Sequence, residues 1–451
     1  MHSPRKRALP VHHVMVISHY WYPENGVPQR RWQWLSGLLT DASYRVTAIA
    51  PPPHYLRNVS TNKWWNSLRS SRNRGPESGP QGERIVRASF IPVNHSLTSK
   101  SLNQLWSALS TVRIAVGQRV RGTMERPDVV VGTVPAIPTA VAAFMVAKIW
   151  RAPLVIDLRD AWPELLDTSE SWNAATGTTS RRERLLSGLP MRLVKGVVTR
   201  ALNSVFKAAD ALIVTSEQHR QDLVARFHAP AHSVVTVRNV FPPATMPETP
   251  AAPDHARGEK PGAHLHVLYA GTIGRAQNLS NAVHAAHLAA REGVHITLRM
   301  IGAGAAKQEI MKEAGELGVD VEMLGRVTPD QLHEHYAWAD TALVHLTDWP
   351  PLRKAVPSKT FELMALGMHI TGVVAGEAAD LIEDLGAGAV VAPESPEDLA
   401  RTWACLAQDR SLLAVDERAA AWVEDEYAHR GPARFLQLIG DVIGAKGRVR
   451  G

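Results

Sequence analysis

Apolar and polar positions along the chain follow two alternating patterns. Short runs rich in Val and Ile are typical of strands buried on both faces, and longer segments carry apolar residues at helical spacing. In the first half, the strands expected from these runs are His13–Ser18, Tyr44–Ala50, Arg84–Ala88, Asp128–Thr133, Leu154–Leu158, Ala211–Ser216 and Val234–Val237, with helices at Arg30–Leu39 and Ser101–Val120. This alternation predicts an α/β class with a doubly wound parallel sheet.

The same alternation stops and then starts again. Phe241–Gly262 holds six prolines and has the composition of a linker. Beyond it we expect further strand and helix pairs, beginning with a strand at Leu265–Ala270 and a helix at Ala276–Arg291. A chain of 451 residues is also longer than one core usually serves. The predicted division is an N-terminal Rossmann-like domain over 1–240, a linker over 241–263, a second such domain over 264–430, and a C-terminal helix with a basic tail over 431–451.

Composition and charge indicate the kind of partner and the cellular compartment. A formal charge of +7 and a pI near 9.6 indicate an acidic partner: nucleic acid, nucleotide phosphate or anionic lipid. The single cysteine, Cys405, excludes an internal disulfide framework and is expected to be a buried small apolar residue in a reducing cytoplasm. The apolar run Val14–Ile17 is too short for a signal peptide. Pro135 and Pro138 interrupt Val129–Ala147, which we interpret as strand, turn and buried helix.

Two cationic segments carry apolar side chains between their charges. Lys63–Arg74 contains Trp64 and Trp65, and Arg181–Ala208 alternates basic residues with Leu and Val. Trp, Lys and Arg favour the surface of an anionic membrane. A solvated insertion explains the first segment equally well, and packing within the chain explains the apolar face of the second.

The segment Val356–Gly367 carries the clearest candidate chemistry. Ser358 lies at a helix start and Gly367 at its end, so Lys359 falls beside the backbone N–H groups of the first turn and Glu362 one turn later. Such an arrangement suits a diphosphate and its neighbouring ribose. The alternative is an ordinary helix start with two solvated charges.

A second candidate site follows the strand Leu154–Leu158. Asp157, Arg159 and Asp160 gather at its carboxyl end, where ligands bind in α/β sheets. The loop Tyr22–Pro28 lies between the first strand and helix, but it lacks G-x-G-x-x-G, so nicotinamide-dinucleotide binding has no support.

The order of these motifs resembles the GT-B glycosyltransferases, specifically the retaining family 4. The resemblance rests on segments spread over nearly the whole chain: Tyr22–Gly26, Asp157–Glu164, Arg238–Asn239, Tyr269–Arg275, Ile301–Gly304, Leu324–Arg326 and Pro357–Glu362. It implies two Rossmann-like domains facing a central cleft. The branch that it resembles most transfers N-acetylated amino sugars in bacterial surface-polysaccharide assembly.

The resemblance also implies roles for individual residues. Glu362 matches the family's second Glu, which holds the ribose hydroxyls, and Arg275 matches a cation on the diphosphate, with Lys359 as a second. These two cations are the expected catalytic groups. The other donor-side residues expected are Gly274, Ser358, Gly302 and Arg326, and those on the acceptor side are Glu24, Asn25, Gly26, Asp157, Arg159 and Asp160.

The chain departs from the family at two positions. Lys354 stands where the first Glu is expected, eight residues before Glu362, and Ser280 replaces a Lys five residues after Arg275. The sequence has no Asp-x-Asp pair, so neither a metal nor a cofactor is expected. The expected partners are a nucleotide-sugar donor, a glycan or lipid-linked acceptor and an anionic membrane surface, without nucleic acid. The alternatives are a sugar-nucleotide epimerase on the same fold and a catalytically silent glycan-assembly or binding protein.

Overall fold

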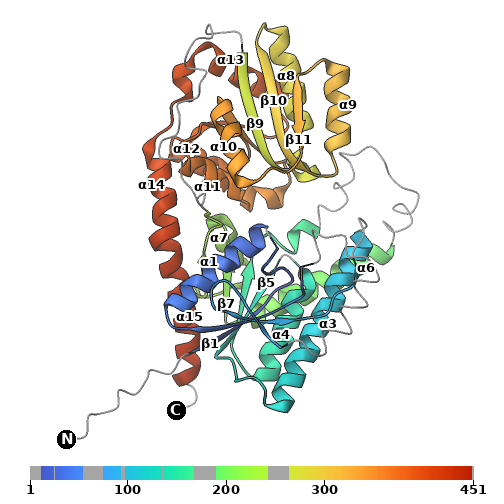
Figure 1. Cartoon of the computed structure of the whole chain (residues 1–451), viewed down its shortest axis with the longest axis vertical. Helices are drawn as coiled ribbons and strands as arrows, with labels where there is room; N and C mark the ends of the chain where they lie inside the picture. Colours follow the sequence, from blue (N-terminus) through green and yellow to red (C-terminus); the bar gives the residue numbers. More distant parts are fainter. Residues whose placement is uncertain are drawn as a thin grey trace, which may run out of the picture.

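Two separate parallel sheets organise the computed structural model of the chain (Figure 1). The structure describes residues 12–24, 26–53, 75–92, 97–134, 136–166, 189–241 and 264–448. Of the regions discussed above, Lys63–Arg74, Asn25, most of the linker and the start of the second cationic segment lie outside these residues.

The first sheet has eight strands in the order β3-β4-β2-β1-β5-β6-β7-β8. All of its pairings are parallel except that of β3 with β4. Val, Ile and Ala fill the central strands, which are buried on both faces, as the continuous apolar runs predict. The bounds are β1 His13–Ile17, β2 Arg45–Ala50, β3 Glu77–Ser78, β4 Arg84–Arg87, β5 Val129–Val134, β6 Leu154–Leu158, β7 Ala211–Val214 and β8 Val234–Thr236.

Helices cover both faces of this sheet. The helix α1 shares a core with the C-terminal helix on one face, while α3, α4 and α6 pack on the other. Their bounds are α1 Val27–Asp41, α3 Leu97–Arg121, α4 Ile137–Trp150, α6 Leu189–Ala208 and α7 Glu217–Phe227, with a short 3-10 helix η2 at Ala231–Ser233. The interrupted apolar stretch at 129–147 is therefore strand, turn and buried helix, as predicted.

The second sheet has six parallel strands in the order β11-β10-β9-β12-β13-β14. It begins only after the Pro-rich segment, with β9, and shares no strand with the first sheet. Its bounds are β9 His264–Thr272, β10 His295–Ala303, β11 Val321–Leu324, β12 Thr341–His345, β13 Ile370–Val373 and β14 Gly388–Val391. The predicted α/β class with two such sheets is confirmed.

The helices of the second half pack around this sheet, and the last of them lead from the second domain back to the first. Their bounds are α8 Ser280–Arg291, α9 Lys307–Leu317, α10 Pro329–Trp338, α11 Ser358–Ala365, α12 Glu377–Asp384, α13 Pro396–Gln408 and α14 Glu417–Asp425. Short 3-10 helices lie at η4 Arg275–Gln277, η5 Pro350–Lys354 and η6 Arg410–Leu413.

The last helices follow one another without a break and lead from the second domain to the first. A π-helical turn, η7 Glu426–Arg430, joins α14 to α15 Gly431–Arg448, which runs along the first domain in Figure 1. Phe435 and Ile439 are buried there against Trp32 and the first sheet. The C-terminal helix thus returns to the N-terminal domain.

Three details differ from the sequence-based expectations. The helix predicted from Ala276 begins at Ser280, because Asn278 adopts a left-handed conformation that ends η4 and separates it from α8. Cys405 is exposed, because it lies on the outer side of α13 instead of in the core. The basic tail is helical as far as Arg448. Among the described helices, none is both long and apolar enough to span a bilayer.

Candidate functional site

Lys359, Glu362 and Tyr336 form a mutually hydrogen-bonded polar cluster at the carboxyl edge of the second sheet. The Lys359 ammonium lies 3.0 Å from Glu362 Oε2 and donates to the Tyr336 hydroxyl at 3.1 Å. That hydroxyl in turn donates to Glu362 Oε1 at 2.8 Å. The Lys359 and Glu362 side chains are 27% and 13% exposed, so the cluster remains open to a ligand. The two residues singled out from the sequence therefore do face one another.

Helix α11 holds this cluster rigidly. Its first turn starts after Pro357, and its other face buries Phe361 and Met364 in the second domain. Tyr336 reaches the cluster from α10, which gives Glu362 a neutral donor on one oxygen and a cation on the other. Burial and the adjacent Glu362 carboxylate raise the pKa of Tyr336, so its hydroxyl stays protonated and donates. Nothing in the sequence pattern singled out Tyr336.

The Arg275 loop lies at the same edge. It follows β9, and the backbone N–H of Thr347, after β12, donates to the carbonyl of Ala276 at 3.0 Å. This bond joins the loop that carries Arg275 to the segment that leads to α11. Gly302 at the end of β10 allows the strands to approach, since a Cβ there would lie 1.8 Å from the Gly271 carbonyl oxygen.

The remaining donor-side residues differ in their surroundings. Gly274 precedes η4 in an extended conformation, and Ser358 is the first residue of α11. Arg326 follows the edge strand β11 and is exposed. All of them lie at the carboxyl ends of strands, but Arg326 is at the margin of the sheet and outside the Lys359, Glu362 and Tyr336 cluster.

On the N-terminal side, Asp157 is fully buried and already paired. Arg31 donates to it from Nη2 at 2.8 Å, and Trp32 Nε1 donates to its other oxygen at 3.0 Å. Neither Arg31 nor Asp157 has any exposed side-chain area. Arg31 Nη1 also donates to the Val237 carbonyl and to Asn239 Oδ1. Asp157 was expected to meet the acceptor, but in this structure its carboxylate instead joins α1, β6 and the segment after β8.

Arg159 and Asp160 follow directly at the carboxyl end of β6. Both side chains are partly exposed, and neither forms an ion pair with another described residue. Burial raises the pKa of Asp160 and lowers that of Arg159. Glu24 accepts from Gln29 Nε2 at 2.9 Å, and the Gln29 amide oxygen accepts from the Gly26 N–H, which closes the start of α1. Asn25 lies outside the described residues.

The two domains meet through polar contacts around Lys354. Its ammonium lies 2.8 Å from Asp222 Oδ2 on α7, and its carbonyl accepts from Ser216 Oγ at 2.5 Å. Arg238 pairs with Glu377 on α12 across the same boundary. The residue that replaces the family's first Glu therefore faces the other domain in an ion pair.

Exchanging the charge of Lys354 tests that contact. Lys354→Glu places two carboxylates together, so we expect a loss of roughly 1 kcal/mol of stability, the scale of a partly exposed pair. Asp222→Lys combined with Lys354→Glu should recover it in urea unfolding. If Lys354→Glu instead tightened nucleotide-sugar binding at unchanged stability, position 354 would be a donor contact after all.

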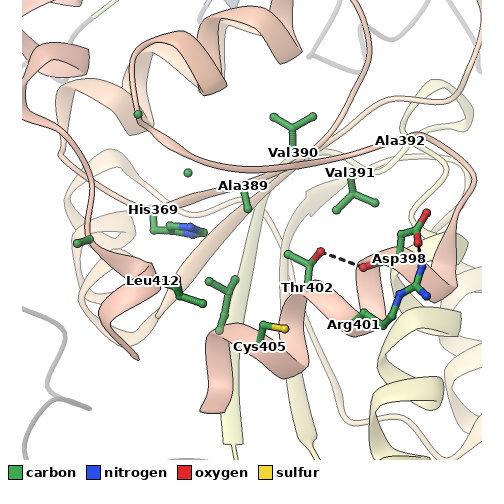
Figure 2. A pocket seen from close by; sticks show the side chains of 14 residues that line it. His369, Ala389, Val390, Val391, Ala392, Asp398, Arg401, Thr402, Cys405 and Leu412 are labelled. Carbon is green, nitrogen blue, oxygen red and sulfur yellow. Dashed lines mark hydrogen bonds and ion pairs between the residues drawn. The ribbon is translucent and has the colours of Figure 1, made fainter. Parts of the chain in front are cut away.

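A hollow in the second domain lies away from these groups. It has a volume of about 610 Å³ and lies between the edge strand β14 and α13, with Cys405 and Leu412 along one side (Figure 2). Arg401 there is paired with Asp398. None of the predicted site residues lines it. Within the described ranges, no group of three or more His, Cys, Asp or Glu side chains is arranged to hold a metal ion.

Two family models match the chain side by side. Residues 25–240 match the glycosyl transferase 4-like domain, and residues 252–427 match the glycosyl transferases group 1. No curated protein matches the chain.

Solved structures of similar proteins align over nearly the whole chain. Sucrose-phosphate synthase from Thermosynechococcus elongatus is 14% identical, with a TM-score of 0.60 over 97% of this chain and 98% of that one. Anabaena HepE in complex with UDP-glucose is 14% identical, with a TM-score of 0.59 over 95% and 99%. WaaG, a glycosyltransferase involved in lipopolysaccharide biosynthesis, is 14% identical, with a TM-score of 0.56 over 95% and 99%. These likenesses confirm the GT-B fold.

Proposed function

Because the chain is a group 1, family-4-like nucleotide-sugar glycosyltransferase with the GT-B fold, we propose that it is a retaining hexosyl- or N-acetylhexosaminyltransferase. Its product would be a glycan or a lipid-linked saccharide for the cell surface, as in the branch that adds N-acetylated amino sugars. The observation that carries this proposal is the cluster of Lys359, Glu362 and Tyr336 beside the Arg275 loop.

Donor binding would rearrange that cluster. Glu362 can accept from two ribose hydroxyls, and Tyr336 orients it by donating to Oε1. Once the ribose occupies the carboxylate, Lys359 is free to turn to the diphosphate at the start of α11. Arg275 supplies a second cation from the neighbouring loop. The pairing of Lys359 with Glu362 therefore keeps both side chains in place before the donor arrives.

The same groups support transfer. When the bond between the sugar C1 and the diphosphate oxygen breaks, negative charge develops on the leaving group, and fixed cations and N–H groups stabilise it. The acceptor oxygen bonds to C1 on the face that the nucleotide leaves, and its proton passes to a phosphate oxygen of the donor. The protein then needs no general base at C1.

A donor screen tests the proposal. Nucleotide sugars, beginning with UDP-glucose and UDP-N-acetylglucosamine, are added to the full chain, and the melting temperature is measured, since a bound donor stabilises by mass action. The positive donor is then incubated with candidate acceptors, and released nucleoside diphosphate is measured. Release that needs the acceptor supports a transferase, whereas epimerised nucleotide sugar without release would contradict it.

The acceptor side also offers a surface for a membrane. The neighbouring helices α3, α4 and α6 contain no Asp or Glu and carry four, one and four Lys or Arg residues, respectively. They also expose apolar side chains, with Leu105 at 49%, Met145 at 44% and Leu193 at 67%. Cations and apolar side chains on one layer suit anionic headgroups. We infer peripheral attachment at the cytoplasmic face, which would bring a lipid-linked acceptor to the first domain.

Vesicle binding checks that attachment. Wild type should bind phosphatidylglycerol vesicles better than phosphatidylcholine vesicles at low salt, because headgroup attraction is screened by salt. Leu105→Asp with Leu193→Asp should reduce binding severalfold. Met311→Asp is the matched control, since Met311 is 40% exposed on the other domain. Equal binding to both lipids would refute the membrane surface.

A further inference from the structure

Two of the three guanidinium nitrogens of Arg159 lack a hydrogen-bond partner at the carboxyl end of β6. Its Nε and Nη1 atoms are shielded from solvent, yet neither has a hydrogen-bond partner. No ion pair involves the side chain among the described residues, although Arg31, at the same edge of the sheet, is completely paired. Shielded N–H groups without acceptors cost free energy, so a fold has reason to keep them only where a ligand supplies the acceptors.

The surroundings hold Arg159 in place without supplying hydrogen-bond acceptors for its Nε and Nη1. Its backbone N–H donates to the Val134 carbonyl at 3.2 Å, and its carbonyl accepts from Thr215 Oγ1 at 3.2 Å. Asp157 is already occupied by Arg31 and Trp32. Asp160, the next residue, forms no ion pair with Arg159, and burial raises the pKa of its carboxyl group. The Asp157 and Asp160 carboxylates attract the Arg159 charge, but neither accepts a hydrogen bond from its Nε or Nη1, so these two donors are fixed in position and left unpaired.

Each of the two unpartnered nitrogens lies on an edge of the guanidinium that a ligand can bind. On the planar group, Nη2 shares one edge with Nε and another with Nη1. Carboxylates and phosphates bind such edges through paired N–H donors. A neutral sugar hydroxyl presents a single oxygen and no negative charge to such an edge.

We propose that Arg159 binds an anionic group of the acceptor, a carboxylate or a phosphate. The inference rests on the proposed transferase function and specifies its acceptor class. A carboxylate would come from an acidic sugar, and a phosphate from a lipid-linked or phosphorylated saccharide. Arg159, at the carboxyl end of β6, would then select acceptors that carry a negative charge, while the second domain binds the donor.

The experiment uses the full chain and five proteins: wild type, Arg159→Gln, Arg159→Lys, Arg275→Ala and Arg45→Gln. Arg45→Gln is the matched control, because Arg45 begins β2 at the opposite edge of the same sheet, paired with Glu125 at 2.6 Å. Each protein is titrated with inorganic phosphate, with glucuronate and with neutral glucose at constant ionic strength, and binding is followed by calorimetry and melting temperature.

We expect wild type, Arg275→Ala and Arg45→Gln all to keep an anion site that Arg159→Gln weakens about tenfold or more, the effect of losing a charge-assisted contact. Arg159→Lys should retain part of the affinity. Without anion, Arg159→Gln should melt no lower than wild type, because shielded donors without acceptors are removed. Tighter binding of phosphate than of glucuronate would indicate a phosphorylated acceptor, and tighter binding of glucuronate would indicate an acidic sugar.

Two results would overturn the inference. One is anion binding that falls in Arg275→Ala but not in Arg159→Gln, which would place the anion at the donor diphosphate site only. The other is a lowered melting temperature in both Arg159→Gln and Arg159→Lys with unchanged anion affinity, which would make Arg159 structural. Failure of sugar transfer with intact binding at Arg159 would instead count against the transferase proposal.

Discussion

Replacing Arg275 or Lys359 by Ala is expected to lower turnover about ten- to a hundredfold. Each cation would contribute a charge-assisted contact to the leaving diphosphate, worth roughly 1.5 to 3 kcal/mol. Glu362→Gln should mainly weaken donor binding, because an amide has one acceptor oxygen where the carboxylate has two. Steady-state kinetics with the donor identified in the screen measure turnover and donor affinity separately.

Two further variants give this prediction its controls. Tyr336→Phe removes the hydroxyl that donates to Glu362 Oε1 and should weaken donor binding less than Glu362→Gln does. Lys312→Ala removes an exposed cation of the same domain, from the pair with Glu316 on α9, and should change neither quantity. If the changes at 275, 359 and 362 altered only the melting temperature, α11 would be an ordinary helix start with two solvated charges.

Breaking the buried pair of Arg31 and Asp157 should have the largest effect on stability. Asp157→Ala leaves the Arg31 guanidinium with no exposed area and no counter-charge, which costs roughly 3 to 5 kcal/mol. Trp32 Nε1 loses its acceptor as well. Urea unfolding followed by Trp fluorescence should therefore show a clearly lower midpoint for Asp157→Ala.

Replacing both Arg31 and Asp157 by apolar residues distinguishes the effect of an unpaired charge on stability from the effect of lost packing. Arg31→Met combined with Asp157→Leu removes both charges together, so it should recover much of the stability lost in Asp157→Ala. Glu125→Ala breaks the exposed pair with Arg45 and should change stability by about 1 kcal/mol or less. Equal midpoints for wild type and Asp157→Ala would contradict the structural role of Asp157.

The local pattern of the sequence predicted the fold well because it records which faces are buried. The runs at Val129–Val134 and Leu154–Leu158 could only be buried parallel strands once helical segments lay between them. The Pro-rich break before His264 separated the two sheets. The spacing of Lys359 and Glu362 within one helix fixed their proximity, because residues three apart share a helix face.

Long-range pairing could not be read in the same way. From the sequence, Asp157 was expected to be an accessible carboxylate. In the structure it is paired with Arg31, which lies 126 positions earlier in the chain. Tyr336 belongs to a different helix from Glu362, and nothing in either local pattern relates the two. Lys354 appeared only as a missing Glu, although it carries a contact to Asp222 in the other domain. In each case the decisive partner is distant in sequence.

The return of α15 to the first domain has a consequence for how the protein is made. Phe435, Leu438 and Ile439 fill the same core as Val14 and Trp32, so the first domain is not contiguous in the polypeptide. During synthesis, its sheet leaves the ribosome with one apolar face covered by α1 alone, and the whole second domain must be translated before α15 completes the cover. A nascent chain of this protein therefore exposes apolar surface to chaperones and proteases until residues near 442 emerge. A fragment ending at 241 would lack α15 and would keep this surface exposed permanently.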